Sequence, residues 1–197
     1  MKNVLIINAH QFYEGFAEGK LNKTLVEAAK KELESKGCEV KETYIEKGYD
    51  VAEEVEKHLW ADLILTQAPV YWFGAPWIYK KYIDEVFTAG LVAQNLIIDD
   101  GRTRKDLSKQ YGSGGKMQDK KHMMSVTWNA PKDAFGDKGQ NLFGVKTVDD
   151  IFFPNTVVYK FCGAEVLNTF ACHDVLKNAD IDNDINRYKE HLNIELF

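Results

Sequence analysis

Short runs of apolar residues alternate along this chain with longer segments in which apolar and polar positions repeat. Val4–Ile7 and Leu63–Thr66 are continuous apolar runs, and His122–Thr127 and Val166–Cys172 extend the series. Runs of this length predict buried strands of a parallel sheet that helices cover on both faces. Glu39–Ile45 alternates imperfectly between apolar and polar residues, which predicts a half-exposed strand at the edge of that sheet.

The segments between these strands repeat their apolar residues with the period of an α-helix. Gly37 follows the first segment as a stop signal, and Pro76 lies just inside the third, where a first-turn proline is tolerated. Thr147 and Asp150 mark a fourth start, and Pro154 is expected to interrupt that helix before it resumes. The repeating residues are Leu21, Leu25, Ala29 and Leu33; Val51, Val55 and Leu59; Ile78, Tyr82 and Val86 with Tyr79, Ile83 and Phe87; and Ile181, Ile185, Tyr188 and Leu192.

Strand and helix alternate five times, and parallel βαβ crossovers are the simplest way to connect them. We therefore expect an α/β fold: a doubly wound parallel sheet of five strands in the flavodoxin-like order 2-1-3-4-5, with helices on both faces. A chain of 197 residues has the size of one domain, so residues 1–197 are expected to form a single domain. Residues 88–120 show no strong period, and we expect an extended loop or insert there.

Composition places the chain among soluble globular proteins, since 45% of its residues are hydrophobic and 28% are charged. A net charge of −5 argues against nucleic acid or an anionic membrane as the main partner. The run at Val4–Ile7 is too short for a signal peptide or a membrane span. Cys38, Cys162 and Cys172 show neither a CxxC nor a metal-ligand spacing, so we expect reduced, mostly buried thiols in a cytoplasmic protein.

The sequence contains no motif that indicates metal binding or acyl transfer. No serine stands in a nucleophile elbow, and the histidines show no ligand spacing, so we expect no metal site. Only one of the histidines, His10, lies where it could contact a phosphate. The five histidines are His10, His58, His122, His173 and His191.

Three consecutive aromatic residues, Tyr71, Trp72 and Phe73, follow the third predicted strand in a loop. Left exposed to water they would form an apolar patch, and the carboxyl edge of an open parallel sheet is where α/β proteins bind ligands. A flat heterocycle such as a flavin would cover these rings. The alternative interpretation is that they belong to the core or to a dimer interface.

Two further loops are expected at the same edge of the sheet. The loop after Asn8 enters a helix near Gly19–Asn22, and the start of a helix presents free N–H groups and a positive dipole end to a phosphate. This loop lacks the Ser/Thr-rich turn of short-chain flavodoxins and is longer, which suits FAD better than FMN. Neither GxGxxG nor GxxxxGK[ST] is present. The third loop is Thr127–Ala130, after the fourth predicted strand.

A basic run, Arg102–Lys105, lies within residues 88–120 and precedes a glycine-rich stretch, Tyr111–Gly115. A solvated loop is the simplest interpretation of such a run. Alternatively, an arginine of the run could hold the 2′-phosphate of NADPH through two parallel hydrogen bonds.

Several of these stretches resemble the NAD(P)H:quinone reductase family, and within it the bacterial modulator of drug activity B group. The resemblance runs almost from end to end and leaves out only Phe12–Phe16 and Gln94–Asp99. The stretches that carry it are Asn3–Asn8, Gly19–Leu25, Tyr71–Trp77, Asp100–Asp106, Lys109–Gly115 and Thr127–Pro131.

The resemblance implies a flavodoxin-like homodimer that binds FAD tightly and reduces quinones by two electrons with NADPH. Adenosine and diphosphate would lie along the first loop, and the isoalloxazine ring would lie against the other two. The Tyr and His that animal quinone reductases carry after the fourth strand have no counterpart in Pro131–Gly136. The implied cofactor-binding residues are Ala17, Glu18, Gly19, Lys20, Leu21, Asn22, Lys23 and Thr24; Val70, Tyr71, Trp72 and Phe73; Thr127, Trp128, Asn129 and Ala130; and Tyr111, reached across the dimer.

We expect ping-pong kinetics, in which NADPH reduces the flavin and leaves before the quinone enters the same slot. Aromatic residues around the slot would hold both flat partners by stacking. Two alternatives stay open. One is an FMN-type carrier or an azo- or nitroreductase on the same fold. The other is a flavin-bound regulatory or ancillary subunit whose partner interaction matters more than turnover.

Overall fold

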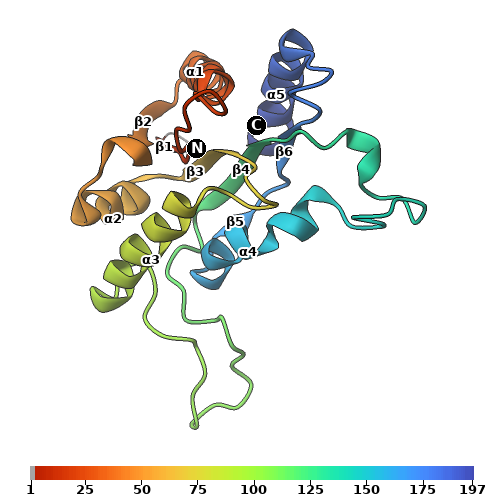
Figure 1. Ribbon diagram of the computed structural model, residues 1–197. Helices are drawn as coiled ribbons and strands as arrows, with labels where there is room; N and C mark the ends of the chain where they lie inside the picture. The colour runs from red at the N-terminus through yellow and green to blue at the C-terminus, as the bar shows by residue number, and fades with distance from the viewer. Residues whose placement is uncertain (1–2) are drawn as a thin grey trace.

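A parallel sheet forms the centre of the computed structural model, which describes residues 3–197 (Figure 1). Its strands follow the order β2-β1-β3-β4-β5, and β6 also pairs with β4. This order confirms the predicted flavodoxin-like topology. The strands are β1 (Asn3–Asn8), β2 (Glu39–Tyr44), β3 (Leu63–Pro69), β4 (Lys121–Thr127), β5 (Glu165–Val166) and β6 (Phe170–Cys172).

The fifth predicted strand is divided into two pieces. Both β5 and β6 run parallel to β4, and the N–H of Leu167 still donates to the carbonyl of His122 at 2.9 Å, but no ladder pairing covers residues 168–169. The backbone N–H of Thr169 donates to the side chain of Asp149 instead of joining the sheet, at 2.9 Å. The prediction of one continuous strand over Val166–Cys172 is therefore wrong at its middle, because a side-chain acceptor outside the sheet replaces a ladder bond.

Helices cover both faces of the sheet, as Figure 1 shows. On one face, α1 and α5 pack over the side chains of Val4 and Ile6; on the other, α2, α3 and α4 pack over Leu5 and Ile7. The alternation of β1 side chains between two cores explains why the run is apolar throughout. The helices are α1 (Lys20–Ser35), α2 (Val51–Trp60), α3 (Trp77–Val92), α4 (Val148–Phe161) and α5 (Ile181–Leu196), with short 3-10 helices η1 (Ile45–Lys47) and η2 (Lys132–Ala134).

Helix α4 continues through Pro154, contrary to the predicted interruption. Its start is fixed by a capping box, in which Thr147 and Asp150 each bond the other's backbone N–H through a side-chain oxygen. Pro154 and Asp150 are both exposed, so the carbonyl that the proline leaves without a donor can be hydrated. Buried Phe152 and Tyr159 hold the helix against the sheet on the opposite side.

Residues 93–120 form a long excursion between α3 and β4, drawn in green in Figure 1. Isolated bridges between Ile97 and Gly115 and between Thr103 and Asp106 are its regular pairings. The excursion is fastened at its end, where the N–H of Met117 donates to the carbonyl of Cys162 at 2.9 Å. None of the helices in the described residues is long and apolar enough to cross a membrane.

Candidate functional site

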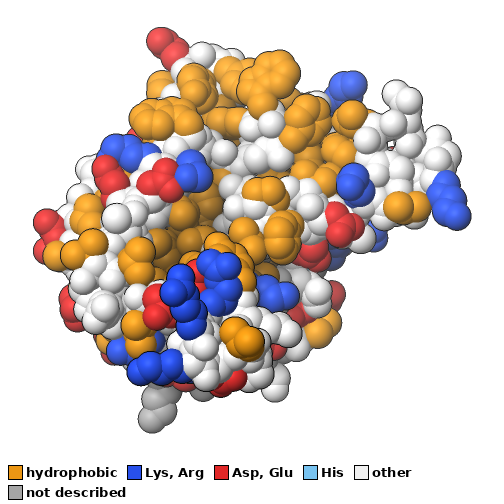
Figure 2. Space-filling view, turned by 90° about the horizontal axis from the view of Figure 1, so that it is seen from below, with side chains coloured by type: hydrophobic (Ala, Val, Ile, Leu, Met, Phe, Trp, Pro, Cys, Tyr) orange, Lys and Arg blue, Asp and Glu red, His pale blue; other side chains and the backbone are white. Residues whose placement is uncertain are grey.

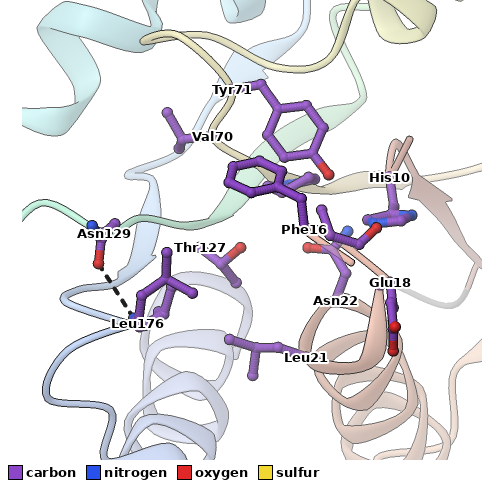
Figure 3. Close-up of a pocket in the computed structure, with 14 residues that line it drawn as sticks. His10, Phe16, Glu18, Leu21, Asn22, Val70, Tyr71, Thr127, Asn129 and Leu176 are labelled. Carbon is purple, nitrogen blue, oxygen red and sulfur yellow. Dashed lines mark hydrogen bonds between the residues drawn. The ribbon is translucent and has the colours of Figure 1, made fainter. Parts of the chain in front are cut away.

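A cavity of about 400 Å³ opens at the carboxyl ends of β1, β3 and β4. We call it the inner cavity (Figure 3). Loops after these three strands supply its walls, as the doubly wound topology predicts. The residues that line it are His10, Phe16, Ala17, Glu18, Gly19, Leu21, Asn22, Pro69, Val70, Tyr71, Thr127, Asn129, Val175 and Leu176.

A second hollow of about 330 Å³, the outer cavity, adjoins the first. Val70 and Asn129 line both cavities, so the two share a wall. The outer cavity is lined by Val70, Trp72, Phe73, Trp128, Asn129, Ala130, Leu142 and Phe143. Together the two cavities bring together most of the residues predicted for the cofactor, with the aromatic residues concentrated in the outer one.

Three predicted residues of the first loop and helix do not line the inner cavity. The Lys20 ammonium pairs with the Glu18 carboxylate at 2.8 Å, and the Thr24 hydroxyl donates to the carbonyl of Lys20 at 3.0 Å. The ion pair with Lys20 lowers the pKa of Glu18. Lys23 lines a third hollow of about 280 Å³, the side cavity, which shares His10, Glu18 and Gly19 with the inner cavity.

Tyr111 and the basic run lie on the 93–120 excursion, and neither lines the inner or the outer cavity. The Tyr111 ring packs against Phe161 at the end of α4, with ring centroids 5.1 Å apart. The Arg102 guanidinium lies over the Tyr111 ring and donates twice to the Asp100 carboxylate, which lowers the pKa of Asp100. A single chain therefore does not bring Tyr111 to the predicted flavin site.

The first turn of α1 faces the inner cavity without a cap. Gly19 precedes the helix with φ +79°, no side chain caps the turn, and no acidic residue lies in it. The backbone N–H groups of Lys20, Leu21 and Asn22 have no hydrogen-bond partner among residues 3–197. Free N–H groups at a positive helix end are suited to an anion.

His10 holds the first loop against the start of α1. A Cβ atom on Gly19 would lie 2.9 Å from the His10 ring, so the ring packs directly on the glycine backbone. The two ring nitrogens contact the Ala17 carbonyl at 3.1 Å and the Glu46 carboxylate at 3.4 Å. Glu46 also accepts the N–H of Phe12 at 2.7 Å. The role of His10 in the chain is thus to position the loop, at the edge of the cavity where a phosphate contact was predicted.

A buried amide network joins β1, α1 and β3 beneath the inner cavity. The Asn8 side chain accepts from the N–H of His10 and from the Asn22 side chain, at 3.0 and 3.2 Å. The Gln67 side chain donates to Asn22 at 3.1 Å. Polar residues at the ends of two buried strands were a signal for this network, but the sequence did not identify the partners.

Tyr71 anchors an aromatic wall of the inner cavity. Its hydroxyl donates to the carbonyl of Gln11 at 2.8 Å, and Tyr13 and Phe16 pack on its ring with centroids 5.5 and 6.4 Å away. Figure 3 shows the Phe16 and Tyr71 rings side by side at the cavity. Burial, reinforced by Tyr13 and Glu46, raises the pKa of Tyr71 to about 12, so its hydroxyl stays protonated.

Trp72 and Phe73 occupy the tip of a tight turn closed by two hydrogen bonds between Tyr71 and Gly74. Both have left-handed backbone conformations, with φ +50° and +70°, which are uncommon for large residues. Trp72 is 94% exposed and Phe73 is 51% exposed. The turn thus holds two large rings in water beside the outer cavity.

The fourth wall of the inner cavity was missed by the sequence analysis. Val175 and Leu176 follow β6, and the N–H of Leu176 donates to the Asn129 side chain at 3.3 Å (Figure 3). Their position after the last strand of the sheet was a usable signal, because its carboxyl end lies at the same edge. His173, also after β6, lies 3.3 Å from the Ala130 carbonyl through Nδ1, and burial lowers its pKa.

Comparisons with known proteins agree with this geometry. The model of the flavodoxin-like fold family matches residues 2–192. NADPH:quinone oxidoreductase MdaB of Haemophilus influenzae is 42% identical over 190 residues, which are 96% of this chain and 97% of that protein.

Two solved structures share the fold at lower identity. One is a Klebsiella pneumoniae protein provisionally assigned as a quinone reductase, at 23% identity and a TM-score of 0.79, covering 98% of this chain and 84% of that one. The other is general stress protein 14 of Treponema denticola in complex with FMN, at 20% identity and a TM-score of 0.63, covering 98% and 99%. From the family match and the identity to MdaB, we conclude that the chain belongs to the flavodoxin-like family that includes NADPH:quinone oxidoreductases.

Proposed function

We propose that this protein is an FAD-containing NADPH:quinone oxidoreductase. The observation that carries the proposal is the junction of the inner and outer cavities at Val70 and Asn129. It places an aromatic slot directly beside a cavity that begins at an uncapped helix start. The activity of the Haemophilus influenzae relative is consistent with such a site.

The residues present fit a flavin. Free N–H groups at the start of α1 would bind a phosphate, and the cradle there is built so closely that Gly19 has no room for a Cβ atom beside His10. The side cavity, which continues from the inner one past Glu18, offers Lys23 and Lys47 to a second phosphate or a nucleoside, beside the carboxylates of Glu18 and Glu46. This additional room supports FAD over the shorter FMN.

The chain would orient the ring system and stabilise charge on it. The backbone N–H groups of Trp72, Phe73, Asn129 and Ala130 have no partner among residues 3–197, so they are available as donors. Such preorganised donors stabilise an anion as an oxyanion hole does. The amides of Val70 and Tyr71 are committed to Thr127 and Gly74, so these two residues would contribute packing and not hydrogen bonds.

A bound flavin supplies the two-electron chemistry, accepting hydride from NADPH and passing both electrons to a quinone. With a flavin held in the inner cavity and reaching the free N–H donors at the shared wall, the outer cavity of about 330 Å³ would be where the other reactants bind. NADPH and the quinone would occupy it in turn, which gives ping-pong kinetics. Trp72, Phe73 and Trp128 would stack on each partner, with each aromatic pair contributing about 0.5–1.5 kcal/mol beyond buried area.

We also propose that the protein is a homodimer in which Tyr111 of a second copy closes the site. A groove of about 360 Å³ between α3 and α4, the α3–α4 groove, is lined by apolar residues that include Phe87, Leu91 and Phe161, and also by Asp84, Asp99 and Asp100. Figure 2 views the molecule from below and shows hydrophobic side chains exposed among charged ones. Tyr111 packs on Phe161 at the end of this groove, so an interface there would carry it to a second copy.

An absorbance spectrum of the purified protein, followed by NADPH addition under argon, tests the proposal. We expect a flavin spectrum that bleaches within seconds and recovers when a quinone is added. The mass of the released cofactor separates FAD from FMN, which the Treponema denticola structure contains. A colourless protein that binds neither flavin would refute the proposal, and a flavin that NADPH reduces too slowly for turnover would favour an ancillary subunit.

A further inference from the structure

We propose that residues 131–147, the 131–147 loop, form the outer wall of the acceptor slot, and that Leu142 limits the size of the quinone that enters. The inference rests on the proposed function and adds to it the class of acceptor. Leu142 and Phe143 line the outer cavity opposite the Tyr71–Gly74 turn, although the sequence resemblance assigns neither to the site.

Phe143 fixes the loop in place. Its ring stacks on Phe135 with centroids 4.5 Å apart and an interplanar angle of 7°, and it meets Trp128 and Phe73 edge-on at 5.5 and 6.0 Å. Phe143 is only 9% exposed. The loop is thus bound to both walls of the outer cavity through one buried ring, which acts as a positioning residue.

Backbone bonds close the loop beneath that ring. The N–H of Gly136 donates to the carbonyl of Lys146 at 3.1 Å, and the N–H of Asp137 donates to the carbonyl of Gly144 at 2.9 Å. Leu142 lies within this closed loop, next to the buried Phe143, and its side chain is 66% exposed at the cavity. An apolar side chain that a closed loop carries at the rim can limit the size of a ligand.

The lining of the outer cavity indicates the class of acceptor. It contains aromatic and aliphatic side chains and one amide, Asn129, but no charged group. Burying a charge in such a lining is costly, whereas planar apolar rings gain by stacking. We therefore infer that the slot selects uncharged quinones with fused rings over anionic acceptors of the same ring size.

The experiment compares Leu142→Trp and Leu142→Ala with Val145→Trp. Val145 is a matched control, because it is exposed in the same loop and does not line the outer cavity. Acceptors would be benzoquinone, menadione, phenanthrenequinone and a sulfonated naphthoquinone. Steady-state KM and kcat are measured for each variant, and the binding of each oxidised quinone is measured by calorimetry without NADPH.

We expect Leu142→Trp to raise KM and Kd for phenanthrenequinone by about tenfold and those for benzoquinone by less than about twofold. Leu142→Ala should narrow the difference in KM and Kd between phenanthrenequinone and benzoquinone. The sulfonated naphthoquinone should bind more weakly than menadione in every variant. In the control Val145→Trp, flavin content and the rate of reduction by NADPH should stay at the wild-type level, since Val145 does not line the outer cavity.

Equal effects of Leu142→Trp and Val145→Trp on all acceptors would overturn the inference, as would tighter binding of the sulfonated quinone. A wild-type protein without flavin reduction by NADPH would instead refute the proposed function. Melting temperatures of the three variants would show whether a lost activity reflects unfolding. If Leu142→Trp unfolds, the comparison of Leu142→Ala with the wild type decides whether Leu142 limits the size of the quinone.

Discussion

Gly19 combines two requirements that no other residue type meets. Its φ of +79° is strained for any side chain, and the His10 ring lies where a Cβ atom would be. The sequence placed Gly19 at the start of the helix, but neither requirement was predicted from it. The second depends on a contact between the two ends of the first loop, which a local pattern cannot reveal.

Gly19→Ala should therefore lower the free energy of unfolding by more than Gly15→Ala does. Gly15 has φ +68° with open space around it, so it carries the backbone penalty of about 1–2 kcal/mol without the contact. We expect Gly19→Ala to lower the free energy of unfolding further and to weaken flavin binding by at least about tenfold. Urea denaturation and flavin titration of both variants check this, and equal losses would contradict it.

Two fully buried histidines should make the protein sensitive to acid. The Nδ1–H of His58 donates to the Glu54 carbonyl at 2.8 Å, whereas its Nε2 has no partner in the described chain. His122 stacks on Tyr159 at 3.6 Å and has an unpartnered Nδ1. Burial lowers the pKa of His58 from 6.5 to about 4 and that of His122 to about 3.

The pKa of each of these two histidines is lower in the folded chain than in the unfolded chain. As the pH falls, the unfolded chain therefore binds the proton first. The stability that these groups contribute is complete above pH 6.5 and is lost as the pH drops toward 4 for His58 and 3 for His122. The His58 share is on the order of 3 kcal/mol. His58→Phe should flatten the fall of melting temperature between pH 6.5 and 4, and His191→Gln should not; identical slopes would contradict the prediction.

At the scale of elements, a buried carboxylate ties β2, α2 and α3 together. Glu54 is 1% exposed, and it accepts from the Thr43 hydroxyl at 2.9 Å, the Lys57 ammonium at 2.6 Å and the Tyr82 hydroxyl at 2.6 Å. The burial of Glu54 was not predictable from the sequence, since this residue lies in a run of acidic residues typical of a first helical turn. Its burial follows from where α3 packs.

Glu54→Leu should lower the free energy of unfolding by about 3–5 kcal/mol, because it leaves the Lys57 ammonium without its buried partner. Glu54→Gln should lower the free energy of unfolding by less, since an amide oxygen can still accept the hydrogen bond from the Tyr82 hydroxyl. Glu53→Gln is the control, as Glu53 is exposed in the same helix. Urea titrations followed by circular dichroism measure the three changes, and a loss at position 54 no larger than the control would contradict the assignment.

Elements were predicted well where apolar runs are buried on both sides. The strand order and the two core rows of α3 follow from such runs, because burial on both faces leaves a clear pattern. The predictions of an interruption at Pro154 and of a single strand over Val166–Cys172 were wrong. The first depends on hydration of a carbonyl and the second on a specific side-chain hydrogen bond, and neither shows in a hydrophobic pattern. Within the candidate site, the loops were predictable from topology, whereas Leu142 and Phe143 reach it through a loop that no period marks.

At the scale of the whole molecule, Tyr111 and the two cavities lie on different parts of one chain. The proposed dimer predicts that Leu91→Glu, in the α3–α4 groove, dissociates it by adding a negative charge to a groove that Asp84, Asp99 and Asp100 already line. Ile194→Glu, exposed on α5, is the control. Light scattering during size-exclusion chromatography measures the mass, and a wild-type monomer, or a Leu91→Glu dimer that persists, would contradict the interface.

The turn that carries Trp72 and Phe73 has opposite expected effects on the melting temperature and on quinone binding. Turns of two residues with positive φ at both positions favour Asn-Gly, and each bulky residue there costs about 1–2 kcal/mol. Replacing the pair by Asn-Gly should therefore raise the melting temperature of this protein while weakening its hold on quinones. A chain optimised only to survive heating would discard the two rings that line the proposed acceptor slot.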